Sequence, residues 1–207
     1  MFKVLTIERE YGSGANEIAR QISERLGWKL WDQLLTTEIA RRLECDHRHV
    51  ENREERCDPL YYRLFKSFLR GSFEGSLNAS RMKLADADGI RQVTEKLVRE
   101  VAADGNCVIV GRGSAYYLHD SPDMFHAFIY ASFEEKVRRL RQSGHEHDAT
   151  ELAETVDVDR AAFIKKYFGV DWPARQYYHL MVNSGMGDEA AVDTIIGAMY
   201  KCRPDPA

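Results

Sequence analysis

A glycine-rich turn between a strand-like and a helix-like segment constrains the fold of this chain most strongly. The turn, Glu10-Tyr11-Gly12-Ser13-Gly14, follows the apolar run from Phe2 to Ile7, which is typical of a buried strand. Residues 16–26 then repeat apolar side chains at helical spacing, and Gly27 suits the end of that helix. This order aims backbone amides and the positive end of a helix at one point, where an anion can bind. We therefore expect Gly12, Ser13 and Gly14 to hold phosphate groups.

The turn departs from the standard phosphate loop. In the pattern G-x-x-x-x-G-K-[ST], a lysine after the last glycine reaches the terminal phosphates and the next hydroxyl serves magnesium. With Gly14 as the last glycine, Ala15 takes the lysine position, Asn16 and Glu17 follow, and Arg9 takes the first glycine position. Arg9 is therefore a candidate for the missing positive charge. The motif alone leaves open a tight strand-to-helix turn that binds no ligand.

Short apolar runs alternate with longer amphipathic runs along the rest of the chain. Further candidate strands are residues 29–31, 107–110, 125–130 and 179–182. One candidate helix follows residue 31 and ends near residue 43, and another begins at a capping box at 132–135 and ends near residue 142. Three more candidate helices span 90–103, 157–168 and 189–200. Such alternation predicts an α/β fold whose mostly parallel sheet is covered by helices on both faces. We expect residues 1–207 to form one domain, with ligands at the carboxyl ends of the strands.

Residues 44–89 interrupt this pattern. They combine a charged run at 51–56, an aromatic run at 61–65 and a glycine- and serine-rich end at 71–80. We expect a small helical insert that covers a cleft and contributes to acceptor binding, with a solvated surface excursion as the alternative. Four possible zinc ligands fall in or beside it, at Cys45, His47, His49 and Cys57, but their spacing matches no standard zinc pattern, so no metal site is predicted.

Composition excludes several classes of partner. The formal net charge is −4, so no global attraction to nucleic acid or to an anionic membrane is expected. No run approaches the roughly 18 apolar residues of a membrane-spanning helix, and the first residues are charged too early for a signal peptide. The four cysteines are scattered and suit reduced thiols. We expect a cytoplasmic protein; the sequence is also compatible with a homodimer.

Three segments of this chain resemble the cytidylate kinase-like family, and they occur in the same order as in that family. The first runs from Thr6 to Gly14 and continues in Glu17-Ile18-Ala19, like the family's Arg-Glu-Tyr-Gly-Ser-Gly turn followed by Glu-Ile-Ala. The second is Cys107 to Gly113, like the family's Val-Ile-Val-Gly-Arg segment. The third comprises 159–161, 166–172 and 178–183. Together they span nearly the whole chain. The resemblance implies a three-layer P-loop kinase fold with a five-stranded parallel sheet and helices on both faces.

The same resemblance implies an ATP-dependent phosphotransferase on a nucleoside monophosphate, with Mg²⁺ as cofactor and small-molecule nucleotides as partners. Gly113 stands where true cytidylate kinases carry an aspartate that helps to recognise cytosine, so CMP itself is not implied. Two alternatives stay open. One is a nucleotide- or phosphate-binding module without turnover, because Ala15 replaces the lysine and Glu17 would repel phosphate unless it faces away or meets magnesium. The other is a kinase of a non-nucleotide metabolite.

The expected site residues follow from both arguments. Residues 12–17 are expected to bind the phosphates of ATP. Arg160 and Lys166, on a lid spanning 144–172, are expected to act as catalytic charges together with Arg9 of the turn. Arg112 follows a buried strand and is expected to bind the acceptor phosphate, with a structural ion pair as the alternative. Asp32 is expected to bind acceptor hydroxyls or water-bound magnesium, and an N-cap of the next helix accounts for it equally well.

Overall fold

The computed structural model describes residues 2–47 and 87–202. Five parallel strands form one sheet in the order β2-β3-β1-β4-β5. Their bounds are β1 Val4–Arg9, β2 Lys29–Trp31, β3 Cys107–Val110, β4 Met124–Tyr130 and β5 Leu180–Asn183. Because β1 lies between β3 and β4, its last residues lie at the middle of the edge formed by the carboxyl ends of the strands. The predicted parallel α/β sheet of five strands is confirmed.

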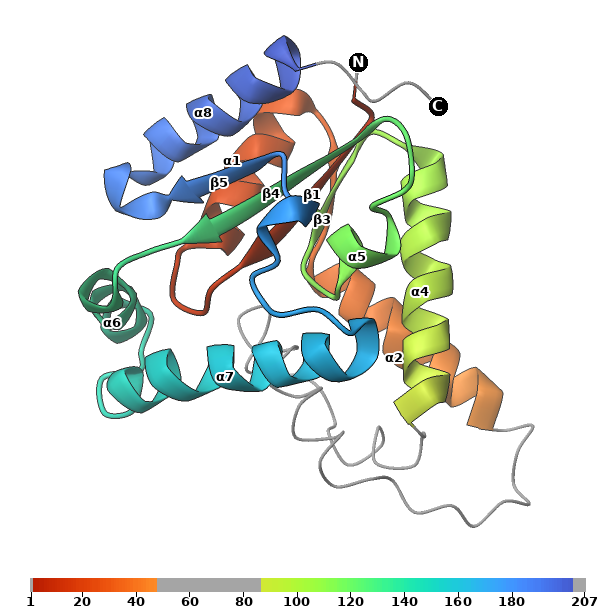
Figure 1. The fold of residues 1–207 in the computed structure, drawn as a ribbon, viewed down its shortest axis with the longest axis horizontal. Coiled ribbons are helices and arrows are strands. Elements are labelled where there is room, and N and C mark those ends of the chain that lie inside the picture. Colours follow the sequence, from red (N-terminus) through yellow and green to blue (C-terminus); the bar gives the residue numbers. More distant parts are fainter. Residues whose placement is uncertain (1, 48–86, 203–207) are drawn as a thin grey trace.

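Helices cover both faces of this sheet (Figure 1). Their bounds are α1 Ala15–Leu26, α2 Gln33–His47, α4 Ala87–Asp104, α5 Ser114–Tyr117, α6 Phe133–Gln142, α7 Ala149–Phe168 and α8 Asp188–Lys201, with short 3-10 turns at Arg175–Tyr177 and Ser184–Met186. Helices α1 and α8 pack on one face, where Leu5 and Ile7 point, and α2, α4, α5 and the end of α7 pack on the other, where Val4 points. No helix within the described ranges is long and apolar enough to cross a membrane.

A third, smaller apolar cluster joins the glycine turn to helices α6 and α7. In it the ring of Tyr11, which is 4% exposed, packs with Leu140 of α6 and with Leu152 and Val156 of α7. Figure 1 shows α6 beyond the end of β4, at the left, and α7 running across the view beneath the sheet. The turn is therefore enclosed by two helices that follow it in the sequence by more than 100 residues.

Two predicted boundaries are wrong in an informative way. Strand β1 spans Val4–Arg9 rather than residues 2–7, because its pairing with β4 continues to Arg9 opposite Ile129. Helix α7 begins at Ala149 rather than near residue 157, since its first turns bury Leu152 and Val156 against α6. The proposed insert at 44–89 lies almost entirely outside the described residues: its first residues end α2 and its last begin α4.

Candidate active site at the glycine turn

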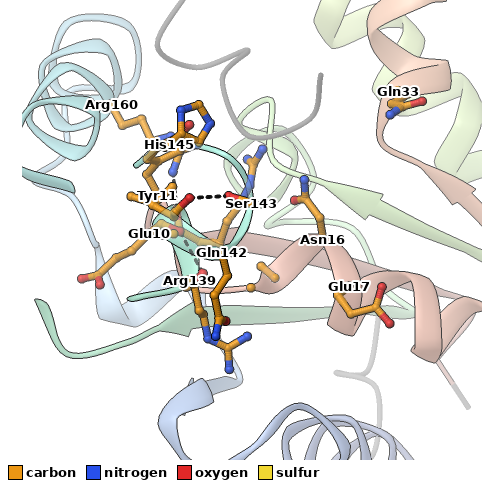
Figure 2. Close-up of a pocket in the computed structure, with 16 residues that line it drawn as sticks. Glu10, Tyr11, Asn16, Glu17, Gln33, Arg139, Gln142, Ser143, His145 and Arg160 are labelled. Carbon is orange, nitrogen blue, oxygen red and sulfur yellow. Dashed lines mark hydrogen bonds between the residues drawn. The ribbon is translucent and has the colours of Figure 1, made fainter. Parts of the chain in front are cut away.

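A pocket of about 540 Å³ opens over the glycine turn (Figure 2). Its walls are residues 9–17, Gln33 at the start of α2, Arg160 of α7, and the segment of α6 and the following loop that contributes Arg139, Leu140, Gln142, Ser143 and His145. The pocket thus lies at the carboxyl end of β1, where ligands of open parallel sheets bind. All six expected phosphate-binding residues, Gly12 to Glu17, line it.

The backbone of the turn is suited to an anion. Gly12 and Gly14 have φ angles of 78° and 77°, a region that a residue with a β-carbon rarely adopts. Gly14 is the N-cap of α1. The amides of Gly12, Gly14, Ala15 and Asn16 have no acceptor in residues 2–47 and 87–202. Unsatisfied amides at a helix N-terminus, together with the helix dipole, favour a negatively charged group.

Ser13 and Glu17 have roles in the turn that differ from direct contact with a phosphate. The Ser13 hydroxyl donates to the carbonyl of Glu10 at 2.8 Å, while the Ser13 carbonyl accepts from the Ser184 hydroxyl at 2.6 Å. Glu17 accepts from Arg20 and Gln21 one turn further along α1, and in Figure 2 it points away from Tyr11 and Ser143. These hydrogen bonds lower the pKa of Glu17 to about 2. Its carboxylate is therefore paired with Arg20 along α1, although the residue lines the pocket.

Two buried arginines, Arg9 and Arg160, place positive charge at the turn. They are 4% and 2% exposed, and both line the pocket. Nη1 of Arg160 donates to the carbonyl oxygen of Arg9 at 2.9 Å and to Oδ1 of Asp157 at 3.2 Å. Burial, and then repulsion by Arg9, lowers the pKa of Arg160 to about 10, so it stays charged at neutral pH. The structure brings these two predicted catalytic charges together.

The two expected acceptor residues lie beside the pocket and do not line it. Arg112 is 2% exposed and follows β3, and its Nη2 donates to the hydroxyl of Thr36 on α2. It has a φ of 62° between Gly111 and Gly113, so three successive residues have left-handed backbone. Burial, followed by repulsion from Arg9, lowers the pKa of Arg112 to about 9. Asp32, directly after β2, is also buried, and its Oδ1 has no hydrogen-bond partner within the described ranges.

Glu8 lies among these arginines. It is 2% exposed, and burial raises its pKa, while the charges of Arg9, Arg160 and Arg112 oppose that rise. Glu8 is therefore a buried carboxyl group beside three arginines, and its burial favours the protonated form. We did not single it out from the sequence, although its place between Ile7 and Arg9 at the end of a buried strand was visible.

Lys166 differs from the other predicted catalytic residues. It is exposed near the end of α7, its Nζ lies 5.4 Å from the ring centre of Tyr167, and it does not line the pocket. Of the predicted lid, 144–172, only His145 and Arg160 are pocket residues. The expectation that Lys166 acts on the phosphates stays a prediction.

Several pocket residues were not predicted as site residues from the sequence. Arg139 is the most informative of them. A β-carbon on Gly14 would collide with Nη1 of Arg139. Its Nε contacts Glu135 at 2.7 Å, and its Nη2 contacts Asp188 of α8 at 2.7 Å. The pair with Glu135 can be expected from the spacing of four residues. The contacts with Gly14 and Asp188 depend on how α6 and α8 pack, which no local pattern reveals.

Comparison with known proteins places the chain in a family. Residues 4–186 match the cytidylate kinase-like family. The chain belongs to that family. No curated protein matches the chain.

Solved structures show the fold of this cytidylate kinase-like protein. An uncharacterized protein from Eubacterium ventriosum has a TM-score of 0.68 at 21% identity, covering 98% of this chain and 100% of its own. Shikimate kinase from Bacteroides thetaiotaomicron has a TM-score of 0.57 at 14% identity, covering 97% and 99%. Shikimate kinase from Acinetobacter baumannii has a TM-score of 0.54 at 12% identity, covering 97% and 94%. The fold is that of the P-loop kinases, as predicted.

Proposed function

We propose that this cytidylate kinase-like protein transfers the γ-phosphoryl group of ATP to a small acceptor, most specifically a nucleoside monophosphate. The observation that carries the proposal is the convergence of four open backbone amides and two buried guanidinium groups on one pocket. Family membership and the P-loop kinase fold support the same chemistry. A small-molecule or nucleotide kinase is the general class, and the monophosphate acceptor is the finer part of the proposal.

On the donor side, the backbone amides of Gly12, Gly14, Ala15 and Asn16 bind the ATP phosphates. Phosphoryl transfer requires alignment of donor and acceptor and stabilisation of charge on the transferring group. Ala15 cannot supply the charge of the usual lysine. Arg9 and Arg160 supply it instead, since both are buried and both line the pocket. Lys166 is proposed as an additional charge that approaches only when α7 rearranges on nucleotide binding.

Magnesium fits the side chains of Asp32, directly after β2, and Asn16, in the first turn of α1. The buried Oδ1 of Asp32 has no hydrogen-bond partner in the described parts of the chain, and the side chain of Asn16 lines the pocket. Carboxylate and amide oxygens, directly or through water, are ligands that Mg²⁺ accepts. When bound, Mg²⁺ would neutralise phosphate charge.

On the acceptor side, Arg112 binds the acceptor phosphate and Asp32 accepts from acceptor hydroxyls. A guanidinium group can contact a phosphate through two parallel donors, which fixes its orientation as well as its position. The hydroxyl of Thr36 already holds one side of the Arg112 guanidinium. The acceptor phosphate would then lie beside the donor phosphates, because β3 and β1 are neighbouring strands.

One alternative is a nucleotide-binding module without turnover, which the Ala15 position favours. The hydrogen bonds that Glu17 accepts from Arg20 and Gln21 suit phosphate binding under either proposal. A kinase of a non-nucleotide metabolite is favoured by Gly113. A β-carbon at Gly113 would lie 2.9 Å from Cζ of Phe168, so a side chain such as the aspartate of true cytidylate kinases does not fit there.

The proposal is tested by incubating the purified protein with ATP, Mg²⁺ and single acceptors, and following ADP formation. The acceptors are a panel of nucleoside monophosphates, with shikimate and other small hydroxyl compounds as the second group. We expect acceptor-dependent ADP formation with at least one monophosphate. Formation only with the second group supports a metabolite kinase. ATP binding without product from any acceptor supports the binding module and refutes the kinase.

A further inference from the structure

We propose that Asp157 of α7 is a positioning residue that fixes which amides of the glycine turn face the pocket. The inference rests on the proposed binding of phosphate at the turn. The carboxylate oxygens of Asp157 connect three parts of the molecule: the glycine turn, α6 and α7. Oδ1 accepts from the backbone amide of Tyr11 at 2.8 Å and from Nη1 of Arg160 at 3.2 Å. Oδ2 accepts from Nζ of Lys136 on α6 at 3.1 Å.

The hydrogen bond from the Tyr11 amide to Asp157 distinguishes this amide from the other amides of the turn. The Tyr11 amide is directed to the carboxylate of α7, whereas the amides of Gly12 and Gly14 have no acceptor in the described residues. Arg160 makes a second contact with the same stretch of backbone, at the carbonyl of Arg9. Asp157 therefore fixes the backbone on one side of the turn, so that the following amides point into the pocket.

Lys136 makes this carboxylate compatible with a phosphate site. Asp157 and Glu10 are two negative groups close to the pocket, and alone they would repel an anion. Nζ of Lys136 lies 3.1 Å from Asp157 and 3.4 Å from Glu10, and the residue is 8% exposed. Because the pair is largely buried, solvent screens it little. The lysine offsets one of these two negative charges, Arg160 is a second cation on Asp157, and the lysine connects the turn to α6.

The packing around the turn leaves little room for it to move independently of these helices. A β-carbon on Gly12 would lie 3.0 Å from the carbonyl oxygen of Lys136. The Tyr11 ring is buried between α6 and α7, with the Arg160 guanidinium carbon 5.6 Å from its centre. A shift of α7 would therefore move Asp157 and the turn together. By this connection the position of α6 and α7 controls the shape of the phosphate site.

The sign of one substitution separates positioning from a simple charge effect. Asp157→Asn removes a negative charge near the pocket, so electrostatics alone would strengthen anion binding. A positioning role predicts weaker anion binding. The NH2 group of asparagine and the ammonium group of Lys136 are both donors and repel each other, and the hydrogen bond from the Tyr11 amide is weakened. We expect the dissociation constant for inorganic tripolyphosphate with Mg²⁺ to rise about tenfold, measured by calorimetry at a temperature where the variant is folded. Glu154→Gln, the same chemical change at an exposed site on α7, should leave it unchanged.

A second readout does not depend on ligand binding. Hydrogen exchange of the Tyr11 and Gly12 amides, followed by NMR, should be faster in Asp157→Asn and in Lys136→Met than in wild type. Unchanged or tighter tripolyphosphate binding by Asp157→Asn overturns the proposal, as does unchanged exchange in both variants. If Asp157→Asn does not fold, Lys136→Met decides the question through the exchange readout. Wild-type protein that binds no tripolyphosphate refutes the proposed function instead, and the exchange rates still test the role of Asp157.

Discussion

The guanidinium group of Arg9 occupies the space that Gly111 leaves open at the end of the neighbouring strand. A β-carbon on Gly111 would collide with Nη1 of Arg9. Strands β1 and β3 run parallel, with Ile7 opposite Val110, so the two residues meet just beyond the paired segment. Gly111 therefore permits a buried arginine to reach the pocket, and two sequence motifs about 100 residues apart depend on each other.

Gly111→Ala is expected to reduce activity by displacing Arg9. Gly27 provides a matched control, since the φ angles of Gly111 and Gly27 are 67° and 65° but nothing lies within 4 Å of a β-carbon on Gly27. Both variants should lose about 1 kcal/mol of unfolding free energy for the left-handed backbone. Only Gly111→Ala should also lower kcat, by about 100-fold, because the arginine loses its position. Equal kcat in the two variants would show that Arg9 is not catalytic.

Arg112→Lys is expected to weaken acceptor binding selectively. Lysine keeps the charge but loses the planar pair of donors that suits a phosphate. We expect the KM for the acceptor to rise about tenfold or more, with the KM for ATP nearly unchanged. Thr36→Val, which removes the hydroxyl that accepts from Arg112, should give a smaller rise of the same kind. A rise in the KM for ATP of equal size would assign Arg112 to the donor side or to the fold.

Arg160 and Lys166 should differ in how much turnover they support. Arg160→Met removes a buried charge that lines the pocket, and we expect kcat to fall about 100-fold or more. Lys166→Met is expected to lower kcat about tenfold, if α7 brings this exposed residue to the phosphates. Lys165→Met is the control, since Lys165 pairs with Asp171 on the surface at 2.7 Å. Identical kcat for the Lys165 and Lys166 variants would remove Lys166 from the site.

His126 is expected to make the protein less stable in mild acid. Nδ1 of His126 lies 2.7 Å from the hydroxyl of Thr6, and burial lowers the pKa of His126 from 6.5 to about 4. Between these two values the unfolded chain binds the proton and the folded chain does not, so stability falls as the pH falls. The loss begins near pH 6.5 and reaches about 3 kcal/mol near pH 4.

Urea unfolding at several pH values measures this effect. His126→Asn, which cannot take up the proton, should show a flatter dependence of unfolding free energy on pH between about 4.5 and 6.5. His147→Asn changes an exposed histidine and should keep the wild-type slope. The same slope in His126→Asn and wild type would assign the acid sensitivity to other groups.

The order of strands and helices could be predicted from the sequence because each element has a local signal. The apolar run at 107–110 and the N-cap at Ser132 appear in the structure, where the Ser132 hydroxyl accepts from the Glu135 amide at 3.3 Å. The Glu135 carboxylate accepts from Arg138 and Arg139, so the second half of the predicted capping box is not formed. The start of α7 was missed because Leu152 and Val156 have a meaning only against α6 and Tyr11. Local periodicity indicates an element, and tertiary packing determines where it begins.

The candidate site was predictable where it is made of backbone. Gly12 and Gly14 could be singled out because a glycine pair between a strand and a helix permits the left-handed backbone that both have in the structure. The side chains that complete the pocket, such as Arg139 and His145, come from elements far along the chain and carry no motif of their own. The burial of Arg160 under the turn was not expected either, because a basic residue on an amphipathic helix is usually solvated.

The most direct test of the account is a crystal structure with Mg²⁺ and a non-hydrolysable ATP analogue. We predict phosphate oxygens about 3 Å from the amide nitrogens of Gly12, Gly14 and Ala15, with the guanidinium groups of Arg9 and Arg160 facing the terminal phosphate. A triphosphate bound elsewhere, with the amides of the glycine turn facing only water, would contradict the account.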